Sequence, residues 1–404
     1  MRVRALINPE LLVWAREDVG LTVEAAAKKI PVKQERLVAW ESGELRPTIK
    51  QLRKLAQAYK RPLAVFYLPG PPKKFQAMRD FRRLPGEVAG IESPALRLEI
   101  RRARFRREIA LELYRELGEE PPTFSLSARL DEDPEEVAMR MRELLGISME
   151  EQSSWRDPYV AIQNWRTALE NAGVLVFQTL ARSYGVDLAE ARGFSLTEMP
   201  LPTLVINAGD APRGRVFSML HELAHIALRE GGLCDMRERD LRPPEEQRIE
   251  VFCNHIAGSI LVPREHLLVA PEVANHGVVS DWADEELGNL SSRFQVSREV
   301  ILRRLLILNR TTEVVYRQKR VQFQEEYDHF REERRARSSK GGPPPATQAI
   351  SRMGKLFARL VLQGFYQEKI SSSDVSEYLE VKLQHMPKIE TAIFGQPVMF
   401  RAAT

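Results

Sequence analysis

Five consecutive residues near the middle of the chain, His221-Glu222-Leu223-Ala224-His225, have the types and spacing of a metal-dependent hydrolase site. Apolar residues from Val216 to Leu228 predict that they lie on a buried helix, which Gly231-Gly232 would end. Residues four apart share a helix face, so both imidazoles can bind one Zn²⁺. Glu222 then lies where a carboxylate can take a proton from the attacking water. The alternative is a helix that packs two histidines in a core, or a surface helix of ion pairs.

A third metal ligand is predicted at Glu250, on a second amphipathic stretch that runs to Pro263. Two histidines and one carboxylate, with a fourth position left for water, are typical of a catalytic rather than a structural zinc site. Glu245 and Glu246 are rival ligands, but they follow two prolines and are interpreted as first-turn acids. Asn254 lies one turn after Glu250 on the same face, where it could bind the free nitrogen of a ligand histidine.

Other polar residues near these motifs have less certain roles. His255 points away from the Glu250 face and is interpreted as a packed or surface histidine. An oxyanion partner is not identifiable; His255, His266 and Arg215 are only candidates. Cys253 is one turn from Glu250, so it is either a small space-filling residue or a thiol near the metal, with a lowered pKa and sensitivity to oxidation.

The ordered set of motifs resembles the ImmA/IrrE family of zinc metallo-endopeptidases, in the subgroup with an N-terminal helix-turn-helix of the Xre type. In chain order, the matching motifs are Arg192-Gly-Phe-Ser-Leu, Leu201-Pro-Thr-Leu-Val-Ile-Asn, the His221-Glu-Leu-Ala-His motif, Glu250-x-x-Cys-Asn and Leu261-Val-Pro. The resemblance covers about residues 8 to 308. It implies a gluzincin-like endopeptidase in which His221, His225 and Glu250 bind zinc and Glu222 is the general base. Family members commonly have Ala at the position of Cys253 and Phe at that of Ile256.

Composition narrows the classes of protein further. With 404 residues and 43% hydrophobic content, we expect two to four units with well-developed cores. The chain lacks a long apolar run and a signal-peptide pattern, which predicts a cytoplasmic protein with no membrane role. Its two cysteines, Cys234 and Cys253, fit a reducing compartment and exclude a disulfide scaffold.

The N-terminal part has the charge and the helix lengths of a DNA-binding module. Residues 1–120 contain 25 Lys and Arg against 16 Asp and Glu. Residues 8–68 are predicted to form short helices joined by tight turns, and these helix and turn lengths are typical of a helix-turn-helix. The candidate contacts with duplex DNA are Lys33, Gln34 and Arg36 for bases, and Arg46 and Lys50 for phosphates. A protein-docking module without a DNA role is the alternative.

The predicted fold class is mostly α with a small β-sheet (α+β). It combines an N-terminal helix-turn-helix bundle, a zincin-like peptidase core and a helical C-terminal unit, and three strands are expected at residues 174–178, 193–196 and 203–207. The edge strand of this sheet could hold an extended substrate. The expected parts are the Xre-type domain 1–72, a basic helical connector 73–156, the peptidase core 157–280, a helix-turn-helix-like segment 281–312, a charged helix with a Pro/Gly linker 313–348, and an interaction unit 349–404.

Two helical segments outside the predicted peptidase core each have two possible roles. The basic helix 95–117 is expected to pack through its apolar stripe, with a second nucleic-acid surface as the alternative. The segment 287–308 is expected to pack on the peptidase, with DNA contact as the alternative. The last unit is interpreted as a protein-interaction or oligomerisation segment.

The leading functional hypothesis is a zinc endopeptidase fused to a DNA-binding domain, a regulator that cleaves a protein partner such as a repressor. The second is a DNA-binding antitoxin or transcriptional regulator, partnered with a toxin, whose zinc site is structural or weakly hydrolytic. Glu222 favours the first hypothesis, because a structural site has no need of a general base.

Overall fold

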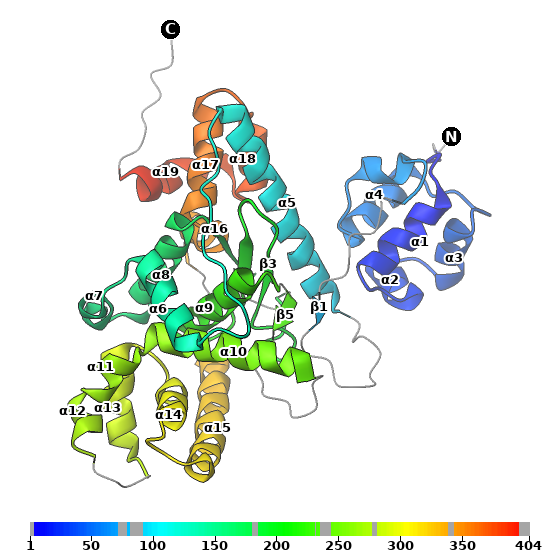
Figure 1. Ribbon diagram of the computed structural model, residues 1–404. Coiled ribbons are helices and arrows are strands. Elements are labelled where there is room, and N and C mark those ends of the chain that lie inside the picture. Colours follow the sequence, from blue (N-terminus) through cyan, green and yellow to red (C-terminus); the bar gives the residue numbers. More distant parts are fainter. Residues whose placement is uncertain are drawn as a thin grey trace. The chain divides into compact units, whose positions relative to one another are not determined.

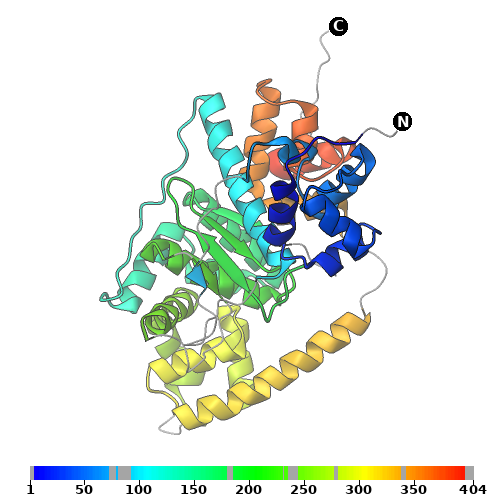
Figure 2. The same ribbon diagram turned by 90° about the vertical axis from the view of Figure 1, so that its right-hand side faces the viewer.

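The computed structural model of the chain is shown in Figures 1 and 2. It describes residues 4–71, 79–80, 92–179, 185–230, 232–234, 244–276, 281–337 and 343–395. The chain divides into two compact units, of which the first contains residues 1–78, 86–102 and 184–186 and the second contains the rest. Helices dominate both units, and one small sheet lies in the second, so the predicted fold class is confirmed.

The first unit is built from short helices whose starts are capped as the sequence predicts. They are α1 (Pro9–Asp18), α2 (Val23–Lys29), α3 (Gln34–Glu41), α4 (Ile49–Ala58) and the 3₁₀ turn η1 (Leu63–Tyr67). The side chains of Asn8 and Thr22 accept hydrogen bonds from first-turn backbone N–H groups, and Thr48 forms a capping box with Gln51. Leu11, Leu37, Trp40, Leu52 and Tyr59 fill the core. Short loops and strong caps therefore fix the angles between these helices.

The basic helix α5 (Pro94–Leu117) uses its arginines in contacts with the protein. In the first unit, Arg97 donates to the Glu17 carbonyl at 2.7 Å and Arg101 pairs with Asp18 at 2.9 Å. In the second unit, Arg106 pairs with Glu380 at 2.9 Å, and Arg107 donates to three backbone carbonyls in the turn at residues 198–201. These contacts support the packing interpretation of the helix over a second nucleic-acid surface.

The sheet of the second unit has the strand order β1-β5-β3-β4-β2. The strands are β1 (Arg79–Asp80), β2 (Leu175–Gln178), β3 (Gly193–Leu196), β4 (Thr203–Ile206) and β5 (Gly232–Cys234). β3 runs antiparallel to both β4 and β5, and β2 runs parallel to β4. Every residue of β2, β3 and β4 is buried, because helices cover both faces of the sheet.

Two long helices lie beside the sheet and carry the chemistry-bearing motifs. The first, α9 (Pro212–Leu228), contacts β3 and β4 and packs along α10 (Pro244–Leu261). α9 is buried along most of its length and ends at Arg229, which adopts a left-handed conformation with φ of 61°, two residues before the glycines expected to stop it. The helices α6 (Pro134–Leu145), α7 (Met149–Ser154) and α8 (Pro158–Asn171) complete this core.

The segment predicted as a second helix-turn-helix is packed within the second unit. Its two helices are α13 (Asp284–Phe294) and α14 (Arg298–Ile307), preceded by the short α11 (Arg264–Leu268) and α12 (Pro271–Ala274). The long α15 (Glu313–Arg337) runs beside α14 (Figure 2). Arg298 of α14 stacks on Phe323 of α15 and pairs with Glu326, so α14 is covered where a recognition helix would need a free face.

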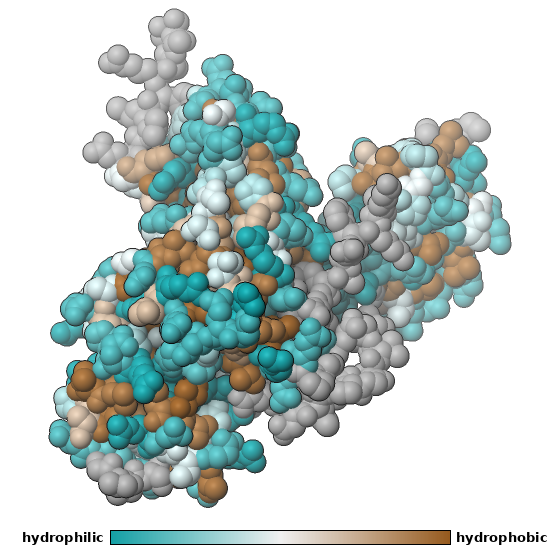
Figure 3. All heavy atoms as spheres, viewed as in Figure 1, coloured by the Kyte–Doolittle hydropathy of each residue, from teal (hydrophilic) through white to brown (hydrophobic). Residues whose placement is uncertain are grey.

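Apolar side chains remain visible on the surface of the part formed by α11 to α14 (Figure 3). Val269, which follows α11, is 72% exposed.

The described helices include none that is both long and apolar enough to cross a membrane.

The C-terminal helices pack on the core, which differs from the separate interaction unit expected from the sequence. They are α16 (Pro345–Met353), α17 (Lys355–Tyr366), α18 (Ser372–Tyr378), the 3₁₀ turn η2 (Leu383–His385) and α19 (Met386–Phe394). Phe357 meets Phe177 of β2 edge to face, with ring centroids 5.6 Å apart. Buried Arg166 of α8 donates to the Ser351 carbonyl at 2.5 Å, and Glu170 accepts from the Leu356 N–H at 3.1 Å. Apolar and polar contacts thus join these helices to the sheet.

We predict that Gly354, between α16 and α17, is essential for this packing. Its φ of 80° and ψ of 161° lie in a region that only glycine adopts readily, and an added Cβ would overlap Glu170 Oε1 and come within 2.8 Å of Arg166 Nη2. Gly354→Ala should lower the free energy of unfolding by roughly 3 kcal/mol, measured by chemical denaturation. Gly146→Ala is the control, because Gly146 has φ of 65° with no atom within 4 Å of the added Cβ. It should cost only about 1 kcal/mol. Equal losses would contradict the prediction.

Candidate metal centre

The two histidines of the motif lie on one face of α9, as their spacing predicts. Both side chains are fully buried, and their Nε2 atoms are 3.1 Å apart. The ring of Phe217, one turn earlier, stacks near His221 with centroids 6.4 Å apart. The imidazoles are therefore fixed by packing rather than exposed at the surface.

Glu250 of α10 reaches the same point from the neighbouring helix. Its carboxylate oxygens lie 3.3 Å from His225 Nε2 and 3.7 Å from His221 Nε2. One ligand atom from each of the three residues lies within 4.8 Å of the others, and no other group of metal-binding side chains this compact occurs in the part of the chain that the structure describes. Zinc bonds of about 2.0–2.1 Å at tetrahedral angles would place ligand atoms about 3.3 Å apart. The separations and the donor types of His221, His225 and Glu250 fit a divalent metal.

A backbone carbonyl orients His225. The chain turns sharply at Arg229 after α9, and the carbonyl oxygen of Glu230 then lies 2.9 Å from His225 Nδ1. A proton on Nδ1 donated to this oxygen leaves the Nε2 lone pair directed at Glu250 and the metal position. Asn254, expected in this role, is buried one turn after Glu250, and its contact with a ligand histidine stays a prediction.

The side chain of Glu222 is buried close to strand β3. It is 1% exposed, and a Cβ added to Gly193 would come within 3.0 Å of Glu222 Oε1 and 3.1 Å of the Val205 carbonyl. Glycine at this position lets the strand approach the carboxylate closely. In the sequence, Gly193 appears only as part of a strand, because its closeness to Glu222 depends on how β3 crosses α9.

The strand beside Glu222 is not an edge strand. β3 pairs with β4 along its length and with β5 at Gly193 and Phe194. An extended substrate therefore has no free strand edge beside Gly193, and substrate binding at an edge of the sheet stays a prediction for its outer strands β1 and β2.

The Cys253 thiol is fully buried, and burial raises its pKa, although a hydrogen bond with His225 acts in the opposite direction. The direction agrees with the space-filling alternative rather than with a thiol of lowered pKa. The contact and the burial favour a neutral, space-filling thiol.

The candidate oxyanion partners are engaged elsewhere. His255 Nε2 lies 2.9 Å from Glu135 Oε1, which Arg304 also contacts at 2.6 Å. Burial raises the pKa of Glu135, but the hydrogen bonds from His255 and Arg304 outweigh it and lower this pKa to about 2. His266 lines a separate cavity of about 590 Å³ between α6 and α11. Arg215 Nε donates to the Asp210 carbonyl at 3.1 Å.

The rival ligands Glu245 and Glu246 lie in the first turn of α10, as their position after two prolines predicts. Glu245 is exposed, and neither belongs to the compact group of ligand atoms. Glu250 is thus the carboxylate that the fold brings to the histidines.

In the first unit, the predicted DNA-contacting residues gather around the start of α3 and α4. Lys33 precedes α3, Gln34 begins it, and Arg36 lies in its first turn with the guanidinium 5.9 Å from the Trp40 ring centroid. Arg46 lies between the two helices and Lys50 in the first turn of α4. All five side chains are exposed, as a binding role requires.

Comparison with family models gives two matches. Residues 170–306 match a peptidase M78 model described as an IrrE N-terminal-like domain. This segment is therefore similar to an IrrE N-terminal-like domain. Residues 12–66 match a helix-turn-helix model, so a DNA-binding module precedes that domain, and the resemblance seen in the sequence is confirmed. No curated protein matches the chain. The matched range contains His221, Glu222, His225 and Glu250 together, and excludes all of α5 and all of the C-terminal helices.

We predict that His221→Ala and Glu250→Ala each abolish stoichiometric metal binding, because each removes one of three ligands. Elemental analysis of protein purified without chelator should find about one metal ion per wild-type chain. Glu245→Ala is the matched control for Glu250→Ala, since it removes a carboxylate from the same helix, and it should retain the metal. Full occupancy in both ligand variants would show that the assignment is wrong.

Proposed function

We propose that the protein is a zinc endopeptidase joined to a DNA-binding domain, and that it regulates transcription by cleaving a protein partner such as a repressor. The observation that carries this proposal is the buried group of His221, His225 and Glu250 with Glu222 beside it, inside a metallopeptidase-type domain. Two imidazoles and one carboxylate are a ligand set that catalytic zinc sites use.

The residues of the site divide the work of peptide hydrolysis. His221, His225 and Glu250 would hold the zinc ion, which when bound supplies Lewis-acid activation of water and of the scissile carbonyl. Glu222 accepts a proton from the attacking water and then delivers one to the leaving amine. Burial and the contact with Gly193 hold the Glu222 carboxylate in place for both transfers. The Glu230 carbonyl keeps His225 in the tautomer that binds metal through Nε2.

The complete burial of the site favours a second candidate function. His221, Glu222 and His225 are at most 1% exposed and Glu250 is 4% exposed, so a peptide substrate has little direct access to these side chains in this conformation. Under this alternative the protein is a DNA-binding antitoxin or regulator, bound to a toxin, with little hydrolytic activity. Glu222 distinguishes the two candidates, because only hydrolysis needs its carboxylate as a base.

For the N-terminal domain, we infer that α3 enters the major groove of duplex DNA. Lys33, Gln34 and Arg36 would then face base edges, while Arg46 and Lys50 would contact phosphates. Glu35 is also exposed on this helix and would repel the backbone of a misaligned duplex.

We predict that Glu222→Gln keeps the metal but lowers proteolysis by about 10²-fold or more, because the amide cannot act as a base. Cells that express wild type or Glu222→Gln would be compared by mass spectrometry of newly formed protein N-termini. Partner fragments should appear with wild type and with Glu245→Gln, whereas the intact partner should co-purify with Glu222→Gln. Equal cleavage by Glu222→Gln and wild type would exclude the peptidase proposal and favour the antitoxin role.

We predict that the full-length chain binds duplex DNA with an affinity that falls steeply with salt, because phosphate contacts release counterions. Arg46→Ala with Lys50→Ala should weaken binding to all sequences and reduce the slope against log salt concentration by roughly two. Lys60→Asn, beyond the other end of α4, is the control: Asn tolerates the positive φ of 52° there, and the slope should not change. A DNA-docking role would be refuted if fluorescence anisotropy detected no binding at low salt.

A further inference from the structure

A cavity of about 590 Å³ opens on the surface of the second unit, between α6, the turn that joins α6 to α7, and α11 (Figure 1). Ligand sites in proteins commonly have volumes of about 300–1,000 Å³, so this space is large enough to take several side chains of another molecule. None of the residues of the metal centre lines it. The cavity is therefore a separate place at which a ligand can dock.

Part of the cavity lining is apolar. Met139 of α6, Ile147 of the turn, Met149 at the start of α7 and Pro263 before α11 contribute hydrophobic side chains. Met139 is 56% exposed although it is a large apolar residue. Unbranched methionine side chains adapt to partners of different shapes. This lining predicts a ligand that brings apolar side chains of its own.

Carboxylates surround the apolar residues. Four exposed residues of the lining are acids, namely Glu136, Glu143, Glu150 and Glu265. Glu136, Met139 and Glu143 lie on one face of α6, because they are three and four residues apart. An apolar side chain between two acids on the same helix face favours a ligand that is both apolar and cationic.

Most of this negative charge is not compensated within the protein. A fifth lining carboxylate, Glu135, is neutralised by Arg304 at 2.6 Å. By contrast, the side chains of Glu136, Glu143 and Glu265 form no ion pair or hydrogen bond with any residue that the structure describes. The lining arginines are Arg142 and Arg264. With histidine counted as neutral, the four exposed carboxylates less these two arginines leave two negative charges in excess.

Two hydrogen-bond donors among the lining residues also lack an acceptor. The hydroxyl of Ser259, which is 3% exposed, and the Nη2 atom of Arg142 have no hydrogen-bond partner in the described part of the chain. Arg142 is held in place through Nη1, which donates to Gln152 Oε1 at 2.9 Å. Buried donors without acceptors are rare in folded proteins, so a ligand with carbonyl oxygens would complete this site.

We propose that this cavity docks a basic amphipathic peptide segment of a protein partner. Lys or Arg side chains of the segment would pair with Glu136, Glu143 and Glu265, and its apolar side chains would cover Met139 and the other hydrophobic lining residues. Main-chain carbonyls would accept from Ser259 and Arg142 once the segment is seated. A small organic cation would leave much of the apolar lining uncovered, and an acidic peptide would be repelled.

Docking at this place would hold the partner beside a helix of the metal centre. Ser259 lies near the end of α10, the helix that also contains Glu250. A partner that itself binds DNA, such as a repressor, contains the basic segments that this surface requires. This choice of partner rests on the proposed function, whereas the docking itself does not require hydrolysis.

The test is fluorescence anisotropy with a labelled helical peptide of about 15 residues, which has leucines on one face and lysines elsewhere. The titrant is the full-length Glu222→Gln protein, so that cleavage of the peptide does not interfere. We expect saturable binding at low salt that weakens as salt is added. Glu143→Gln with Glu265→Gln should raise the Kd roughly fivefold, because two charge contacts are lost.

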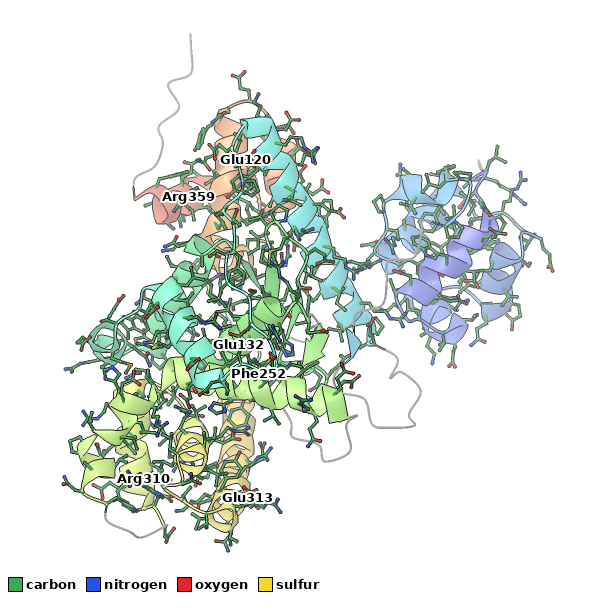
Figure 4. All side chains as sticks on the ribbon, viewed as in Figure 1. Glu120, Glu132, Phe252, Arg310, Glu313 and Arg359 are labelled. Atoms are coloured by element: carbon green, nitrogen blue, oxygen red, sulfur yellow. The ribbon has the colours of Figure 1, made fainter. Side chains whose placement is uncertain are left out.

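The matched control is Glu120→Gln with Glu313→Gln, which changes the net charge by the same amount. Both residues are exposed and lie outside the cavity (labelled in Figure 4), so the Kd should not change. A second variant, Met139→Ala, truncates an exposed side chain whose loss does not threaten the core, and it should also raise the Kd.

Several outcomes would overturn the proposal. They are no binding at low salt, equal Kd values for the two double variants, and equal binding of a peptide with Glu in place of Lys or with Ser in place of Leu. Because binding is measured without hydrolysis, each of these results would leave the peptidase proposal intact. Conversely, peptide docking together with an absence of partner cleavage by wild type would refute the peptidase proposal alone.

Discussion

The arrangement of the second unit depends on the burial of four ionisable side chains in an apolar core. His221, Glu222, His225 and Glu250 come from two adjacent helices and are surrounded by residues such as Leu220 and Ile256. Removing a carboxylate from water costs several kcal/mol unless a positive charge compensates it. A divalent cation between the imidazoles and Glu250 provides that compensation, so metal binding and the stability of the α9–α10 pair should be coupled. The close approach of β3 at Gly193 then fixes Glu222 relative to the same centre.

Local patterns in the sequence were sufficient for the parts of this site that one element supplies. The i, i+4 spacing placed His221 and His225 together, capping residues set the helix starts, and short β-rich runs predicted β3 and β4 nearly to the residue. Contacts between distant elements were not predictable in this way. The Glu230 carbonyl that orients His225 depends on a left-handed turn after α9, and the importance of Gly193 depends on the path of β3 across α9. Position along the helix separated Glu250 from Glu245 and Glu246, which follow two prolines in the first turn of α10, and the family resemblance agreed with that choice.

The C-terminal region shows a different limit of sequence reasoning. Amphipathic helices after a Pro/Gly-rich segment suggested a separate unit, yet Phe357, Arg166 and Glu170 join these helices to the sheet and to α8. The apolar stripe was recognised, but a pattern within one helix does not say which surface covers it. The same is true of α14, whose residues suited a recognition helix but whose partner is α15. DNA binding is therefore assigned to the N-terminal domain, where Lys33 to Arg36 remain exposed.

We propose that two imidazoles and a carboxylate hold zinc, while the thiol of Cys253, three residues after Glu250, does not bind it. X-ray absorption at the zinc edge, on full-length protein purified without chelator, tests this most directly. Zn–N and Zn–O bonds of about 2.0–2.2 Å are distinguishable from Zn–S bonds of about 2.3 Å. We expect the zinc to be bound by nitrogen and oxygen atoms alone, with the scattering pattern of two histidine rings, and we expect this pattern to be lost in His221→Ala. A sulfur ligand, or a zinc environment unchanged by that substitution, would contradict it.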